Sequence, residues 1–152
     1  MSGPGEEAAP RGHRTVPHPA DLRIEAWAPT RAECLAEAVS ALVDSFADVT
    51  EVGDHADTGA GWEVTSELTA ASDADLLAAV LDEVIYRLDV ADLVPTAAGI
   101  AEEHADRVRL RLRGVGTDAV EFTGAIPKAV ALSDLVLTRT GDGWTAAATV
   151  DV

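Results

Sequence analysis

Two aspartates near opposite ends of the chain are the residues best placed to do chemistry. Asp21 opens the first strand-like run of the sequence, and Asp151 lies at the end of the last one. If strands 22–27 and 144–150 pair antiparallel, the start of one lies beside the end of the other, and the two carboxylates meet. Close carboxylates repel unless a cation neutralises them, and oxygen ligands favour calcium, magnesium or manganese over zinc. We therefore expect a site for a hard divalent cation; the alternative is two solvated aspartates at strand ends.

Other reactive residue types support weaker hypotheses. Asp54-His55 with Asp57 has metal-like composition but lies in a glycine-rich loop, so we interpret it as a solvated loop. His18, three residues before Asp21, is able to orient that carboxylate or to be a surface histidine. Cys34 is the only cysteine, which excludes an intrachain disulfide and a cysteine zinc cluster, and we predict that it is buried and structural. Serine hydrolysis has no Gly-x-Ser-x-Gly motif to support it.

Length and charge narrow the class of protein. The 152 residues suit one domain. Eleven lysines and arginines against 27 aspartates and glutamates give a net charge of −16, which opposes direct binding to a phosphate backbone and favours a cation or a basic protein partner. The sequence contains no apolar stretch of about 20 residues and no signal-peptide core, so we expect a soluble, cytoplasmic protein.

The periodicity of apolar residues predicts the elements that must position the two aspartates. Residues 1–17 are rich in glycine, proline and charge and are predicted to be a disordered N-terminal arm, with the domain spanning 18–152. Thr30 with Glu33 forms a capping box before a helix whose apolar stripe ends near Asp48.

Further along the chain, Ser72 repeats the capping pattern before a second helix with a wide apolar stripe. Alternation of apolar and polar residues predicts the remaining strands at 62–70, 93–102, 107–113, 129–138 and 144–152. Two helices and about six strands predict an α+β fold: a two-layer sandwich with both helices on one face of a mixed, mainly antiparallel sheet.

Four short motifs, in this order and spacing, resemble the archease family. They are His18-x-Ala20-Asp21-x-x-Ile24-x-Ala26, Phe46-Ala47-Asp48, Lys128-Ala129-Val130 and the final Asp151-Val152, and the resemblance covers residues 18–152.

The resemblance implies a compact α+β protein that is not itself catalytic. It implies a cofactor of the GTP-dependent, RtcB-type RNA ligase of tRNA splicing or RNA repair, which promotes guanylylation and repeated turnover of the ligase. It also implies a divalent-cation site, calcium first and magnesium or manganese as alternatives, at Asp21, Asp151 and the main-chain oxygen of Val152, with Asp48 as a weaker ligand. The expected partner is the ligase, with no direct binding of nucleic acid and no membrane.

This chain departs from the archease pattern at two places near the expected site. Pro19 stands where family members commonly have threonine, and Ala131-Leu132-Ser133 follows the lysine segment where they carry Thr-Tyr-His or Thr-Tyr-Ser. Loss of these hydroxyls is expected to weaken support of the ligands or contact with the partner.

Two other functions are compatible with the sequence. One is a chaperone-like or protein-interaction module in which the cation only staples the terminal strands together. The other is a metal-dependent phosphoesterase, because clustered carboxylates can position a hydrolytic cation, although no general base or phosphate-binding loop is evident.

Overall fold

The structure is a computed structural model that describes residues 10–17, 21–49 and 62–152. His18, Pro19 and the predicted loop with Asp54, His55 and Asp57 lie outside the described residues. The described elements, in chain order, are β1 (Gly12–Pro17), β2 (Asp21–Ala28), α1 (Arg31–Asp44), β3 (Ala47–Asp48), β4 (Trp62–Thr69), α2 (Asp73–Ala91), β5 (Leu93–Glu103), β6 (Arg107–Gly116), a 3-10 turn (Thr117–Ala119), β7 (Glu121–Phe122), β8 (Ala129–Val130), β9 (Val136–Thr140) and β10 (Gly143–Asp151).

Both helices begin where the capping residues predict. The Thr30 side chain accepts a hydrogen bond from the backbone N–H of Glu33 at 3.1 Å, and Ser72 does the same for Asp75 at 3.1 Å. In a capping box the Glu33 carboxylate would also accept a hydrogen bond from the backbone N–H of Thr30. In the structure it accepts one from the Thr30 hydroxyl instead. Among the described residues, no helix is long and apolar enough to cross a membrane.

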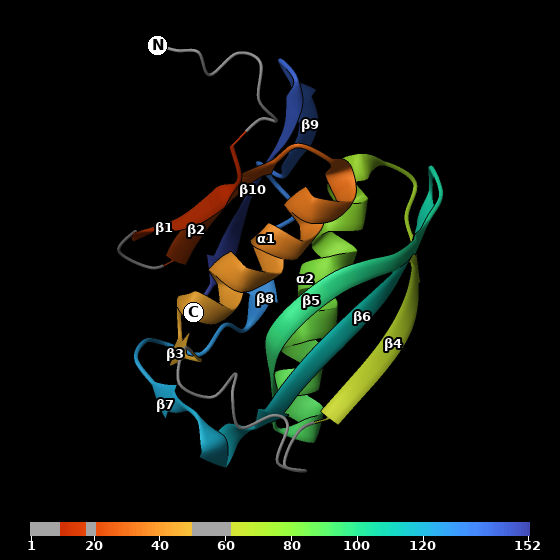
Figure 1. Ribbon diagram of the computed structural model, residues 1–152. Helices are drawn as coiled ribbons and strands as arrows, with labels where there is room; N and C mark the ends of the chain where they lie inside the picture. The colour runs from red at the N-terminus through yellow and green to blue at the C-terminus, as the bar shows by residue number, and fades with distance from the viewer. Residues whose placement is uncertain (1–9, 18–20, 50–61) are drawn as a thin grey trace.

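The strands form two main sheets, and every described strand pair is antiparallel. The first sheet has the order β1-β2-β10-β8, with β9 also paired to β10, and the second has the order β4-β6-β5. A short β3-β7 pair completes the described strands. Helix α1 contacts β2 and β10 of the first sheet and β5 of the second, and α2 likewise contacts strands of both sheets, so the helices lie between them (Figure 1).

The α+β class is confirmed, and both helices lie on one face of the sheet that holds the chain's terminal strands. The strands do not form one sheet of about six, however, and the fold has a third layer. The reason is that α1 is buried around most of its circumference. Its buried residues are Cys34, Leu35, Ala36, Ala38, Val39, Ala41, Leu42 and Val43. A helix buried on two sides needs a second sheet to cover it.

The N-terminal arm was predicted too long. Residues 12–17 form β1, which pairs with β2 along its whole length, from Gly12 opposite Trp27 to Pro17 opposite Leu22. The alternation of glycine, proline and charge concealed this strand, since β1 has few apolar residues to bury. It is held instead by the backbone pairing with β2 and by polar contacts with α1.

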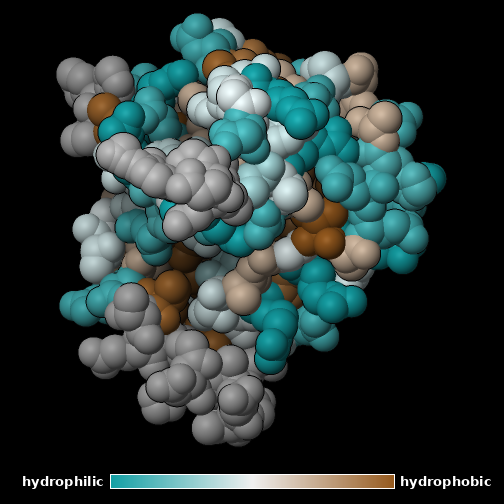
Figure 2. Space-filling view, turned by 45° about the horizontal axis from the view of Figure 1, so that its top comes forward, coloured by the Kyte–Doolittle hydropathy of each residue, from teal (hydrophilic) through white to brown (hydrophobic). Residues whose placement is uncertain are grey.

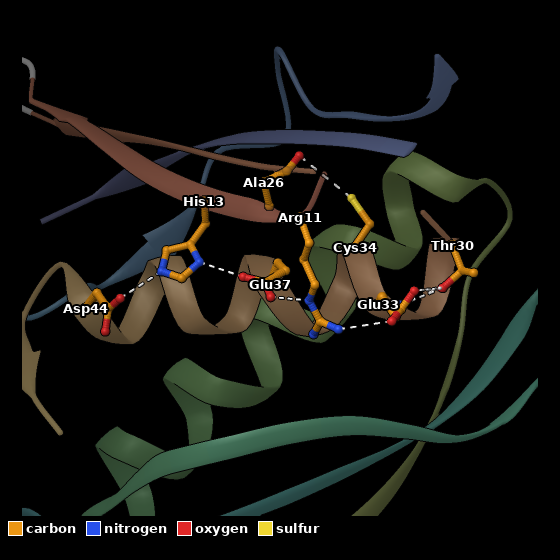
Figure 3. Close-up of polar contacts among 8 residues, drawn as sticks. All are labelled: Arg11, His13, Ala26, Thr30, Glu33, Cys34, Glu37 and Asp44. Atoms are coloured by element: carbon orange, nitrogen blue, oxygen red, sulfur yellow. Dashed lines mark hydrogen bonds and ion pairs between the residues drawn. The ribbon is translucent and has the colours of Figure 1, made fainter. Parts of the chain in front are cut away.

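Histidine 13 joins β1 to α1 through both nitrogens of its ring (Figure 3). Nδ1 lies 2.6 Å from the Glu37 carboxylate and Nε2 lies 2.8 Å from that of Asp44. Arg11 extends the contact to Glu33 at 3.1 Å and to Glu37. Burial by itself lowers the pKa of His13, but the hydrogen bonds and charges of the two carboxylates outweigh it and raise the pKa above its usual value.

The stability of this contact should therefore depend on pH. When folding raises the pKa of a histidine, that histidine stabilises the folded protein. The stabilisation is complete at pH values below the unfolded pKa of about 6.5, and it is lost as the pH rises through the raised pKa. The pKa of Glu37 is shifted the other way: burial raises it, but the hydrogen bonds from His13 and Arg11 prevail and lower it, so its contribution is lost at acid pH.

We expect the difference in unfolding free energy between the natural protein and His13→Gln to shrink as pH rises through that window. Urea unfolding at fixed ionic strength, from about pH 5.5 to 8.5, measures it. A difference that stays constant over this range would show that the histidine is neutral in the folded protein.

Candidate metal site

The pairing of β2 with β10 brings the two predicted aspartates together. The register is continuous from Trp144 opposite Ala28 to Asp151 opposite Asp21, so the two aspartates are direct cross-strand partners. Such partners have their Cβ atoms about 5 Å apart on the same face of the sheet. The antiparallel pairing on which the prediction depended is thereby confirmed.

This pair lies on the face of the sheet that points away from the helices. In both strands the core-facing positions alternate with outward-facing ones, as the burial of Ile24 and Ala148 beside the partly exposed Arg23 and Thr149 shows. The aspartates share the outward face with Arg23 and Thr149. They are therefore accessible to solvent and to a partner.

A shallow pocket with a volume of about 560 Å³ surrounds the pair. Its lining comes from β2, β10, the start of β9 and the loop between β8 and β9: Asp21, Arg23, Ala131, Ser133, Asp134, Val136, Thr149 and Asp151. The pocket thus combines three carboxylates with two hydroxyls and one guanidinium.

Hydrophilic residues cover much of the face of the molecule shown in Figure 2, and apolar residues form separate patches on it.

Asp134 is the residue of this pocket that the sequence prediction missed. It has a φ of 62°, a left-handed conformation that aspartate adopts in turns, in the loop that interrupts the predicted strand 129–138. Arg23 lies between it and β10, donating to the Asp134 carbonyl at 3.5 Å and to the Thr149 hydroxyl at 3.2 Å. A turn-forming Ser-Asp pair between two apolar runs was the available signal.

Backbone hydrogen bonds fix the end of β10 that carries Asp151. The Lys128 N–H donates to the Asp151 carbonyl at 2.8 Å, and the Ala131 N–H donates to the Thr149 carbonyl at 2.9 Å. Val152 follows directly and is partly exposed. The Asp151 carbonyl is thus already engaged, so its side chain and the oxygens of Val152 are the donors that this end of the strand offers.

Asp48, the weaker predicted ligand, has a different setting. It lies in β3, opposite Glu121 of β7, and is not among the residues that line the pocket. Across residues 10–17, 21–49 and 62–152, no group of three histidine, cysteine, aspartate or glutamate side chains is arranged to hold a metal. The predicted ligand set of Asp21, Asp151 and main-chain oxygen contains only oxygen, and oxygen-only sets suit calcium, magnesium or manganese better than zinc.

The departure at Ala131-Leu132-Ser133 falls at the pocket itself. Ala131 and Ser133 line it, whereas Leu132 is 76% exposed. Ser133 keeps a hydroxyl there, so the loss of hydroxyl groups is incomplete on this side of the site. Pro19 belongs to the part of the chain that the structure does not describe.

Cys34 has the structural role that was predicted. It is fully buried, its Sγ lies 3.7 Å from the Ala26 carbonyl, and burial together with the Glu37 charge raises the pKa of its thiol to about 11. A thiol with this pKa is not a nucleophile near neutral pH.

Comparison with known proteins agrees with the fold and identifies the family. The model of the Archease protein family (MTH1598/TM1083) matches residues 13–152. The chain is similar to the "Probable protein archease" of Mycobacterium tuberculosis strain H37Rv, at 43% identity over 97% of this chain and 79% of that protein. It is also similar to the "Protein archease" of Archaeoglobus fulgidus, at 27% identity over 92% of this chain and 98% of that protein.

Two solved structures share the fold. One is the crystal structure of an archease from Thermotoga maritima, described as a possible chaperone. It has a TM-score of 0.60 at 16% identity, and the match covers 90% of this chain and 94% of the Thermotoga chain. The other is the solution structure of protein 1598 from Methanobacterium thermoautotrophicum. It has a TM-score of 0.62 at 19% identity, and the match covers 93% of this chain and 99% of the Methanobacterium chain. The family match over nearly the whole described chain, together with the mycobacterial relative, shows that this protein belongs to the archease family.

Proposed function

We propose that this protein is an accessory cofactor of a GTP-dependent, RtcB-type RNA ligase in the cytoplasm. In this role it binds a divalent cation and promotes guanylylation and repeated turnover of the ligase during tRNA splicing or RNA repair. The observation that best supports the proposal is the direct pairing of Asp21 with Asp151 in a pocket on the solvent-facing side of the sheet. Membership of the archease family supports it independently.

The proposed cation ligands are the carboxylates of Asp21 and Asp151 and the main-chain oxygen of Val152, with Asp48 as a weaker contributor. Calcium is the first candidate, and magnesium or manganese are the alternatives. When bound, the cation would supply positive charge for the phosphates of the nucleotide that activates the ligase. The chain's own contribution is to keep the two aspartates adjacent, through the β2-β10 register and the Arg23 contact with Thr149.

The proposed role is assistance and not catalysis. The residues that line the pocket include neither histidine nor cysteine, so the described part of the site offers no imidazole to activate the hydroxyls of Ser133 and Thr149 and no thiol nucleophile. The net charge of −16 suits a partner with a basic surface, through steering of the encounter. The same charge opposes independent binding to nucleic acid or to an anionic membrane.

A guanylylation assay tests this proposal. Adding the purified protein to a matching RtcB-type ligase with GTP, RNA and manganese should raise both the initial rate of guanylylation and the number of turnovers. A variant with residues added after Val152 should lose part of this effect and part of its cation affinity, because the extension replaces the charged carboxylate at Val152 with a neutral peptide carbonyl. Failure of the natural protein to accelerate the ligase would refute the proposed role.

A chaperone-like or interaction module is the second candidate. It is favoured by the position of the aspartates at the ends of two paired strands, where a cation would staple those strands together. In that case, calcium should raise the midpoint of thermal unfolding while ligase activity is unchanged by the protein.

A further inference from the structure

The side of the molecule formed by the C-terminal half of α2 and residues 117–128 contains a second cavity, of about 540 Å³. We call it the α2 groove; its lining is Ile85, Tyr86, Leu88, Asp89, Asp92, Thr117, Phe122, Ile126, Pro127 and Lys128. It shares no lining residue with the aspartate pocket. The groove is therefore a separate surface that the cation site does not explain.

Exposed apolar side chains gather at this groove. Five large apolar residues in the described part of the chain are exposed, and three of them line it: Tyr86 at 54%, Phe122 at 43% and Ile126 at 44%. A fourth, Val90, is 62% exposed and follows Tyr86 by four residues, on the same side of α2. Apolar groups concentrated in one concave place, with polar ones beside them, are typical of a docking site.

Tyr86, the tyrosine that lines the groove, is in contact with the guanidinium of the next residue. The Arg87 guanidinium lies 5.7 Å from the centre of the Tyr86 ring. Arg87 itself donates to Glu83 at 2.8 Å and to the Ser66 hydroxyl at 3.2 Å. A contact of this kind restricts the ring and so reduces the conformational entropy that Tyr86 loses on binding.

The charge at the groove indicates what kind of partner it fits. Asp89 and Asp92 lie at the C-terminal end of α2, and no basic residue lies in the last turn of that helix. Because a helix C-terminus already carries partial negative charge, these two carboxylates are unfavourable there unless a cationic group approaches. Lys128, the only basic residue among the lining residues, offsets one of these two charges and leaves the groove with an excess of one negative charge. The complementary ligand is therefore an apolar side chain beside an arginine or lysine.

The α2 groove is also joined to the cation site through the backbone. Pro127 and Lys128 form its wall, the Lys128 N–H donates to the Asp151 carbonyl at 2.8 Å, and Ala129 pairs with Asp151. One segment of chain thus borders both surfaces. Backbone pairing of this segment connects one wall of the groove to the end of β10 that carries Asp151.

We propose that the α2 groove binds a segment of the RNA ligase in which an apolar side chain is adjacent to an arginine or lysine. This inference rests on the proposed function for the identity of the partner. The apolar side chain packs against Tyr86 and Ile126, and the basic one faces Asp89 and Asp92. The groove supplies affinity, and the aspartate pocket supplies the effect on guanylylation.

Direct binding of the purified ligase to the immobilised protein, by biolayer interferometry with calcium present, tests the inference. Tyr86→Ala and Ile126→Ser should each weaken binding by at least about tenfold, as expected for residues at the centre of an interface. Asp89→Asn should weaken binding mainly at low salt, because its effect is electrostatic. The matched control is Ala101→Ser, which alters an exposed apolar residue of β5 outside both the groove and the aspartate pocket, and should bind like the natural protein.

Outcomes for the groove and for the proposed function can be told apart. If the natural protein binds the ligase and Tyr86→Ala and Ile126→Ser bind equally well, the groove proposal is overturned while ligase activation stands. If binding depends on the groove but guanylylation is not accelerated, the groove proposal holds and the proposed function fails. Absence of any binding by the natural protein also overturns the groove proposal. So does a dimer in sedimentation velocity that Ile126→Ser dissociates, because the occupant would then be a second copy.

Discussion

Replacing Asp21 with asparagine is expected to abolish most of the cation binding and, with it, the acceleration of the ligase. Asparagine has nearly the same shape as aspartate but lacks its charge. The proposed site has two carboxylate side chains directly opposite each other, so the substitution removes half of their negative charge. We expect affinity for calcium, magnesium or manganese to fall about 100-fold or more, measured by isothermal titration calorimetry.

The controls for this prediction use aspartates in other settings. Asp142→Asn alters an exposed residue in the turn between β9 and β10 and should leave affinity unchanged. Asp134→Asn changes the third carboxylate of the pocket and measures whether that residue contributes. If Asp21→Asn binds calcium as tightly as the natural protein, the two aspartates are solvated residues at strand ends and hold no cation.

Replacing Phe46 with alanine is expected to cause a large loss of stability. Phe46 is fully buried and lies just after α1, and its ring stacks on that of Phe122 with centroids 6.1 Å apart. Removing a buried phenylalanine side chain costs about 3–5 kcal/mol, since it loses apolar burial and leaves a cavity. For a chain of this length, the unfolding midpoint should fall by roughly 10 °C, measured by calorimetry or circular dichroism.

Two further substitutions separate packing from ring stacking. Phe46→Leu keeps most of the volume and should cost less than half as much as alanine. Phe122→Ala removes the same stacking contact from the partly exposed side, at 43% exposure, and should also cost less. Equal losses for Phe46→Ala and Phe122→Ala would mean that the ring contact, and not burial of Phe46, provides the stability.

Local patterns predicted most of the elements because helices and strands have short periods. The hydroxyls of Thr30 and Ser72 cap helices where expected, and the alternation of arginines with apolar residues in β6 produces one buried and one exposed face. What local patterns could not predict is how strands combine. The β1 strand has almost no apolar alternation, and its attachment depends on His13 reaching Glu37 and Asp44 on a helix more than 20 residues away.

At the candidate site, too, some features were predictable from local sequence patterns and others were not. Asp21 and Asp151 were predicted to meet because antiparallel pairing of the strands next to them leaves one arrangement. Asp134 was missed because residues 129–138 were interpreted as one unbroken strand, although Ser133-Asp134 is a turn-forming pair. The close approach at Gly114 was also invisible: a Cβ there would lie 2.0 Å from the Val94 carbonyl oxygen, a contact made by the neighbouring strand.

The sequence by itself determined the α+β class, the two capped helices, the structural role of Cys34 and the pair of aspartates, because each follows from spacing within one segment or from one pairing. Only the tertiary structure decided that two sheets enclose the helices, that Asp134 joins the pocket, and that Tyr86 and Ile126 form a groove with Asp89. These features depend on contacts between segments far apart in the chain, whose relative placement is set by packing of the whole core and not by any local pattern.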